Sequence, residues 1–196
     1  MKRIALASGV AVVGFLVAAR AEAHVFGAWG AGLGEGFFHP IGGLDHVLAM
    51  VAVGLWAAQL GGRALWALPL AFLVMMAVGG LAGGMGISLP WIEAGIAASV
   101  VVLGMAVAWA VRWPVIAGLG LTGLFALCHG HVHGAEIPQA AAPILYAGGF
   151  LAATAFLHGV GFAMGRIAAS NALRAKLLRG AGASIAIAGA VMWVVG

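Results

Sequence analysis

Long apolar runs separated by short polar or glycine-containing breaks dominate this 196-residue chain. After residue 23 there are six such runs, at about residues 40–60, 64–84, 90–111, 114–134, 143–165 and 180–196. Each is close to the ~20 residues that an α-helix needs to cross the hydrocarbon core of a bilayer. Prolines stand at the start of four runs, at Pro40, Pro90, Pro114 and Pro143, where their fixed φ suits a first helical turn. The pattern predicts an all-α, polytopic membrane helix bundle with six transmembrane helices.

The first 23 residues have a different pattern. Basic Lys2 and Arg3 precede an apolar stretch from Ile4 to about Ala18, and Ala21-Glu22-Ala23 follows. This is the anatomy of a cleaved secretory signal peptide, so we expect residues 1–23 to be removed and residues 24–196 to form the transmembrane domain. An uncleaved first helix is the alternative, although its apolar core would be short for a span. Cleavage would make His24 the new N-terminus, with an amine and an imidazole that could bind a metal.

Composition supports a membrane protein and excludes several other classes. Hydrophobic residues make up 64% of the chain and charged residues 7%, which is far outside the range of a soluble domain. The net charge of +4 comes from nine basic and five acidic residues, too few and too scattered for nucleic-acid binding. Gly79, Gly80, Gly83 and Gly84 form overlapping G-x-x-x-G pairs, which predict close helix packing. Because of the high hydrophobic content, the expected partner is the lipid bilayer.

The basic residues predict the orientation. Those after residue 23 all fall between runs one and two, three and four, or five and six, at Arg63, Arg112, Arg166, Arg174, Lys176 and Arg179. The two other loops contain no basic residue. Under the positive-inside rule the basic side is cytoplasmic. We therefore expect a multi-pass protein of the bacterial inner membrane, with both mature termini in the periplasm.

This topology places most ionisable residues at the periplasmic ends of the runs. His39, Asp45 and His46 open the first run, and Glu93 lies in the first turn of the third. The sequence from His129 to Glu136 closes the fourth run. Such residues are costly to place in a bilayer, so they normally face a protein interior and mark a functional site. His158, about fifteen residues into the fifth run, is expected to lie deeper, either as a helix-to-helix hydrogen-bond partner or on a metal path.

Helical spacing indicates which side chains act together. His129, His133 and Glu136 are at i, i+4 and i+7 and share one stripe, whereas His131 points to nearly the opposite side. Imidazoles with carboxylates suit a nickel, cobalt or zinc site. The primary candidate ligands are His39, Asp45, His46, His129, His133 and Glu136; the weaker candidates are Glu93, His158, His131 and His24. We expect no resident cofactor.

At these residues the sequence resembles the HupE/UreJ family of hydrogenase and urease accessory membrane proteins. The segment His39-Pro-Ile-Gly-Gly-Leu-Asp45-His46-Val-Leu-Ala-Met50 matches the family pattern H-P-x-x-G-x-D-H-x-L-A-M. A second match is His129-Gly-x-x-His133-Gly-x-Glu136-x-Pro138. The second segment departs from the family at Cys128, where an aromatic residue is usual, and at His131 and Val132.

The resemblance implies a permease for nickel, with cobalt as an alternative, that supplies hydrogenase or urease maturation proteins. The six primary candidates would recognise the metal. The chain has no G-x-x-x-x-G-K-[ST] motif, which favours a secondary transporter rather than an ATP-driven one. Two alternatives are an intramembrane zinc hydrolase with Asp45 or Glu136 as base and a metal-binding accessory protein without transport. The absence of an H-E-x-x-H motif favours a protein that is not an enzyme.

Overall fold

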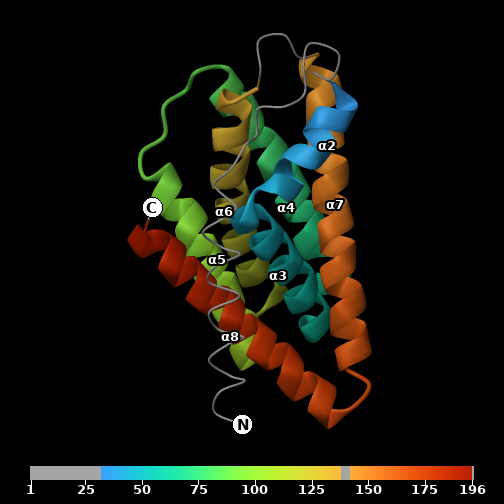
Figure 1. The fold of residues 1–196 in the computed structure, drawn as a ribbon. Helices are drawn as coiled ribbons and strands as arrows, with labels where there is room; N and C mark the ends of the chain where they lie inside the picture. Colours follow the sequence, from blue (N-terminus) through green and yellow to red (C-terminus); the bar gives the residue numbers. More distant parts are fainter. Residues whose placement is uncertain (1–31, 138–141, 196) are drawn as a thin grey trace.

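The computed structural model describes residues 32–137 and 142–195, which fold into a bundle of α-helices (Figure 1). The helices are α2 (Leu33–Gly42), α3 (Leu44–Leu60), α4 (Ala64–Gly84), α5 (Ile92–Trp109), α6 (Val115–Ala135), α7 (Pro143–Ala168) and α8 (Ala172–Val195). No strand occurs within these two ranges. The predicted signal peptide and His24 lie outside the described residues.

Five helices, α4 to α8, are long and apolar enough to cross a membrane. Helices α2 and α3 qualify as a sixth span only together, because the chain bends by 87° between them. The prediction of an all-α membrane helix bundle is confirmed, with five to six candidate spans. The last helix begins earlier than predicted, at Ala172 rather than near residue 180. Arg174, Lys176 and Arg179 therefore lie in its first turns and not in a loop.

The bend between α2 and α3 was not predicted. We expected Pro40 to open the first span, but Pro40 lies inside α2, and α3 begins at Leu44 after Gly43 in an extended conformation (φ −93°, ψ 115°). Pro143 does begin α7 as predicted, and Pro114 directly precedes α6. Helix α2 packs closely against α7: a Cβ at Gly36 would clash with the carbonyl oxygen of Tyr146.

Helix α3 forms the centre of the bundle. All six residues from Ala52 to Ala57 are buried, as expected for an apolar helix enclosed on every side. It packs against α7 on one side and against α4 and α5 on the others. Its 17 residues span roughly 25 Å at 1.5 Å per residue. The first turn of α3 therefore lies near one end of the bundle and its last turn near the other.

Glycines allow the helix backbones to approach closely. Along α4 and α6, a Cβ at Gly83 would clash with the carbonyl oxygen of His131, and one at Gly134 with that of Gly80. Helices α5 and α8 meet in the same way at Gly104. The close packing predicted from G-x-x-x-G pairs is confirmed for α4, and it holds the end of α6 in place.

The two ends of the bundle differ in their polar residues. Histidines at the start of α3 and the end of α6 meet at one end. At the other end, Nε of Arg179 donates to the carbonyl of Ala108 (2.7 Å), and the indole N–H of Trp56 donates to the carbonyl of Val111 (2.8 Å). The basic residues therefore lie at the end opposite the histidines, as the sequence predicted.

Two glycines of α6 provide a test of this packing. Gly134→Ala should reduce the free energy of unfolding by ~1–3 kcal/mol, because the new methyl group overpacks the contact with α4. Gly120→Ala is the matched control, since a Cβ there meets nothing within 4 Å, and it should not destabilise the protein. Thermal unfolding of the purified protein in detergent measures both. Equal stability of the two variants would contradict the close approach of α4 and α6.

Candidate metal centre

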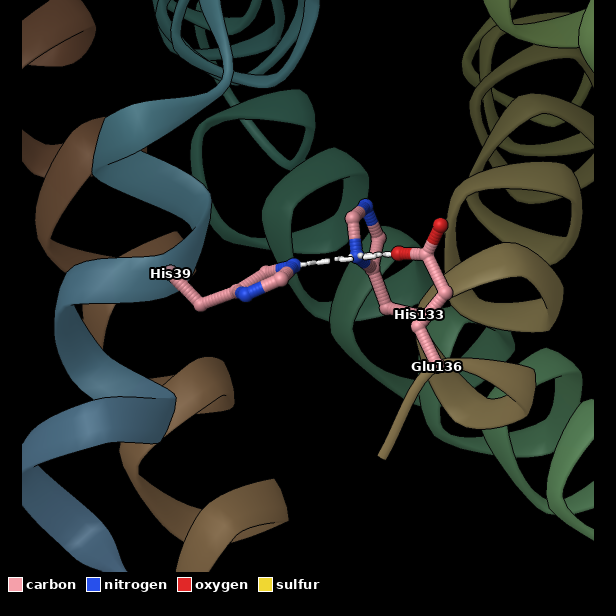
Figure 2. Close-up of side chains that lie close together, drawn as sticks. All are labelled: His39, His133 and Glu136. Atoms are coloured by element: carbon pink, nitrogen blue, oxygen red, sulfur yellow. Dashed lines mark hydrogen bonds and ion pairs between the residues drawn. The ribbon is translucent and has the colours of Figure 1, made fainter. Parts of the chain in front are cut away.

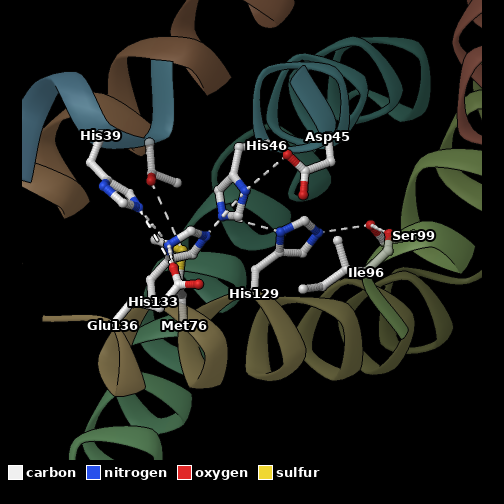
Figure 3. A network of polar contacts seen from close by, with 10 residues as sticks. His39, Asp45, His46, Met76, Ile96, Ser99, His129, His133 and Glu136 are labelled. Atoms are coloured by element: carbon white, nitrogen blue, oxygen red, sulfur yellow. Dashed lines mark hydrogen bonds and ion pairs between the residues drawn. The ribbon is translucent and has the colours of Figure 1, made fainter. Parts of the chain in front are cut away.

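Four imidazoles from three helices form a continuous row, here called the histidine row, at one end of the bundle (Figure 3). Nε2 of His39 lies 2.9 Å from Nδ1 of His133. Nε2 of His133 lies 3.3 Å from Nδ1 of His46, whose Nε2 lies 3.2 Å from Nδ1 of His129. Helices α2, α3 and α6 thus bring together residues 83 to 94 positions apart in the sequence.

Local structure explains this arrangement. His129 and His133 lie one turn apart on α6 and face the same side, as their spacing predicted. His131 faces away, with its Nε2 2.6 Å from the carbonyl oxygen of Ile87 in the connection between α4 and α5. The bend after Gly43 allows α2 to place His39 beside the last turn of α6. Without this bend α2 would continue the axis of α3 past the row.

The candidate ligand atoms form two groups of three, each with all atoms within 4.8 Å of one another. The groups are His39, His133 and Glu136 (Figure 2), and Asp45, His46 and His129. Two nitrogen or oxygen ligands of one transition-metal ion, each at about 2.1 Å, lie at most ~4.2 Å apart. The three distances in the first group are 2.9, 3.3 and 3.9 Å, so this group could hold an ion with little movement of its side chains.

Two carboxylates lie beside the row and are more exposed than its inner imidazoles. Oε2 of Glu136 is 3.3 Å from Nδ1 of His133, and Oδ1 of Asp45 is 3.6 Å from Nδ1 of His46. The Glu136 and Asp45 side chains are 54% and 34% exposed, whereas His46 and His129 are 1% and 0% exposed. Hydrogen bonding to His133 lowers the pKa of Glu136 from its ordinary value. A cation approaching this end would therefore meet negative charge first and buried imidazoles second.

Ser99, on α5, sets the direction of hydrogen bonding along the row. Its hydroxyl donates to the carbonyl of Ile96 (2.6 Å), so its oxygen accepts from Nε2–H of His129 (2.8 Å). In the neutral ring, Nδ1 of His129 then accepts from Nε2–H of His46 (3.2 Å). The Nδ1 lone pair of His129 thus accepts a hydrogen bond that a metal ion could replace. Sequence reasoning missed Ser99, although it is the one hydroxyl side chain of α5.

Aromatic rings cover the row. Phe150 on α7 lies 4.9 Å, 5.7 Å and 6.2 Å, between ring centroids, from His133, His46 and His39. Tyr146, one turn earlier, lies 5.9 Å from His39. No signal in the sequence distinguished Phe150 from the other aromatic residues of an apolar run. These rings exclude water from the inner part of the row and strengthen the electrostatic interactions there.

The weaker candidates lie outside the row. Glu93 is exposed in the first turn of α5 and belongs to neither group of ligand atoms. His131 bonds to the backbone on the far side of α6. His158 is buried in the middle of α7, separate from both groups. The structure therefore brings together the six primary candidates and none of the weaker ones that it describes.

These features define a polytopic membrane protein with a cluster of imidazoles and carboxylates near one end of its helix bundle. The chain belongs to the HupE/UreJ family, whose sequence model, described as HupE / UreJ protein, matches residues 10–192. The family consists of hydrogenase and urease accessory proteins and is not a known enzyme family. The resemblance seen in the sequence is thereby confirmed.

A curated relative supports this assignment. The chain is 46% identical over 176 residues to Protein HupE of Rhizobium leguminosarum bv. viciae, a match covering 89% of this chain and 90% of that protein. No solved structure matches the chain.

Removal of the Ser99 hydroxyl tests its role in the row. Ser99→Ala should cost ~1–3 kcal/mol of stability, because the buried Nε2–H of His129 loses its acceptor. Ser184→Ala is the control, since the Ser184 hydroxyl is exposed and bonds only to its own helix. Thermal unfolding in detergent gives the comparison. If Ser99→Ala unfolds at the same temperature as Ser184→Ala, the proposed direction of hydrogen bonding is wrong.

Proposed function

We propose that the protein is a secondary transporter of a divalent transition-metal ion, with nickel as the favoured ion and cobalt as the alternative. It would supply the ion for hydrogenase or urease maturation. The observation that carries this proposal is the unbroken contact of four imidazoles, with a carboxylate beside each of two of them, at one end of a bundle of apolar helices. Membership of an accessory family for nickel-dependent enzymes favours nickel over zinc.

The chemistry of the row suits a transported ion. Neutral imidazole nitrogens are good ligands for nickel, cobalt and zinc, and the two carboxylates offset the charge of the ion as it loses its hydration water. Before binding, the ligand nitrogens are satisfied by one another. An ion therefore replaces hydrogen bonds that re-form when it leaves, so the site need not hold an unsatisfied polar group in either state. This property fits repeated binding and release.

The distribution of charge supports a direction of transport. The basic residues lie at the end opposite the histidine row, and the positive-inside rule makes that end cytoplasmic. The row would then face the periplasm of a bacterial inner membrane, and both mature termini would be periplasmic. Glu136 and His39, the more exposed pair, would capture the ion, and His46 and His129 would receive it. With no nucleotide-binding motif in the chain, binding and removal of the ion in the cytoplasm would drive uptake.

Reporter fusions test this orientation. A periplasmic alkaline phosphatase fused after residue 140 should be active, and one fused near Asn171 should be inactive, because the helix between these points crosses the membrane once. Fusions to a cytoplasmic reporter at the same positions should give the opposite result. Activity of the phosphatase only at Asn171 would place the histidine row in the cytoplasm and overturn the capture role.

Metal uptake tests the function itself. In cells that lack their own nickel transporters, the wild-type protein should increase uptake of radioactive nickel. His133→Ala should reduce that uptake by at least ~10-fold, the usual size of effect when a metal site loses a ligand or its support. His131→Ala, which removes an imidazole outside the row, should reduce it only slightly.

Matched membrane levels of the two variants, measured by immunoblot, are required for this comparison. Equal losses in the two variants at equal protein levels would count against the histidine row as the transport site. Full uptake by His133→Ala would do the same.

A further inference from the structure

One buried imidazole remains without a role. His158 on α7 is 3% exposed, and neither of its ring nitrogens has a hydrogen-bond partner among the described residues. Buried side-chain polar atoms in folded proteins almost always have a partner, because an unsatisfied one costs free energy. The helix-to-helix hydrogen bond that usually explains a histidine in a membrane helix is not formed here. The ring is therefore available to a ligand.

His158 lies close to the histidine row but deeper in the bundle. The ring of Phe72 on α4 is 6.1 Å from the ring of His129 and 5.1 Å from that of His158, between centroids. One aromatic ring thus separates the end of the row from His158. Along α7, His158 follows Phe150 by eight residues, or about 12 Å at 1.5 Å per residue. The direction is towards the basic end of the bundle.

A hydroxyl and a thioether side chain lie between the histidine row and His158. Thr154, one turn before His158, is fully buried; its hydroxyl donates to the carbonyl of Phe150 (3.0 Å) and lies 3.9 Å from the Met76 sulfur. Met76 is one turn from Phe72 on α4. The facing sides of α4 and α7 therefore hold a thioether and a hydroxyl at the level between the row and His158.

We propose that His158 is a second, transient metal-binding site that receives the divalent transition-metal ion from the histidine row and passes it towards the cytoplasmic end. The inference rests on the proposed transport function and adds a residue outside both sequence motifs. A single imidazole with water as the remaining ligands binds an ion weakly. Weak binding suits an intermediate position, because the ion must leave it as readily as it arrives.

The imidazole is not needed to hold the helices together. Helices α3 and α7 meet at this level through their backbones: a Cβ at Gly54 would clash with the carbonyl oxygen of His158 itself, and one at Gly161 with that of Val51. The ring makes an edge-to-face contact with Phe72 (interplanar angle 86°). A phenylalanine can make the same contact, so His158→Phe removes both nitrogens and keeps the ring.

The experiment compares nickel uptake by His158→Phe and by His131→Phe, the same change at a histidine outside the path. For His158→Phe the maximal rate should fall by at least ~10-fold, while the nickel concentration for half-maximal uptake stays unchanged, because capture by the row is intact. Its thermal stability should equal or exceed that of the wild type, since an unsatisfied polar group is removed. His131→Phe should transport at close to the wild-type rate.

Uptake by His158→Phe at the wild-type rate would overturn the proposal. Should that variant fail to accumulate in the membrane, His158→Leu provides the same test with a smaller side chain. Failure of both to fold would also overturn it, by showing that the imidazole is structural.

Nickel binding to the purified full-length proteins separates this inference from the transport proposal. At high nickel, His158→Phe should bind one equivalent fewer than the wild type, and equal stoichiometry would count against a site at His158. If the wild type takes up no nickel, the transport proposal fails, and the binding result still decides whether His158 is a metal site.

Discussion

The structure depends on a constraint of the bundle interior: imidazoles buried among apolar helices must find their partners among one another. The histidine row meets this constraint through its own contacts: nitrogens of neighbouring rings lie 2.9 to 3.3 Å apart, and Nε2–H of His129 donates to Ser99. Ser99 in turn donates to the carbonyl of Ile96, an acceptor with a spare lone pair. Neutral imidazoles that contact one another in this way do not bury a net charge.

The histidine row is possible only because the helices that carry it approach closely and in a fixed register along their axes. The contact of α4 with α6 is made backbone to backbone at Gly83 and Gly134, in the same two turns that carry His131 and His133. The bend after Gly43 brings α2 across the end of the row. Packing of small residues, which supplies no chemistry of its own, thereby sets the distances between ligand atoms.

The row and His158 differ in how their polar atoms are satisfied, and in the transport that we propose they would handle an ion differently. The row has its own internal partners and two nearby carboxylates, so in this proposal it would attract and hold a cation. His158 has an aromatic neighbour and no hydrogen-bond partner among the described residues, so it gains from an ion but lacks the charge to retain one. A strong outer site followed by a weak inner one would let an ion move inwards.

Local patterns in the sequence were enough to determine the helices, the segregation of basic residues to one end, the shared stripe of His129 and His133, and the family. Each depends on hydropathy, charge or the helical repeat, which act over a few residues. The pairing of His39 with His133 required the tertiary structure, because it depends on a bend at Gly43. The position of Pro40 had instead indicated the start of the first span.

Only the tertiary structure could also identify Ser99, Phe150 and the unsatisfied ring of His158. Their roles depend on which side chain from another helix lies opposite. Ser99 is one of many small residues in an apolar run until α6 places His129 beside it. Such contacts are decided by helix packing, which depends on the glycines at helix contacts and on side-chain volumes from the whole chain. The hydropathy of a segment does not reveal them.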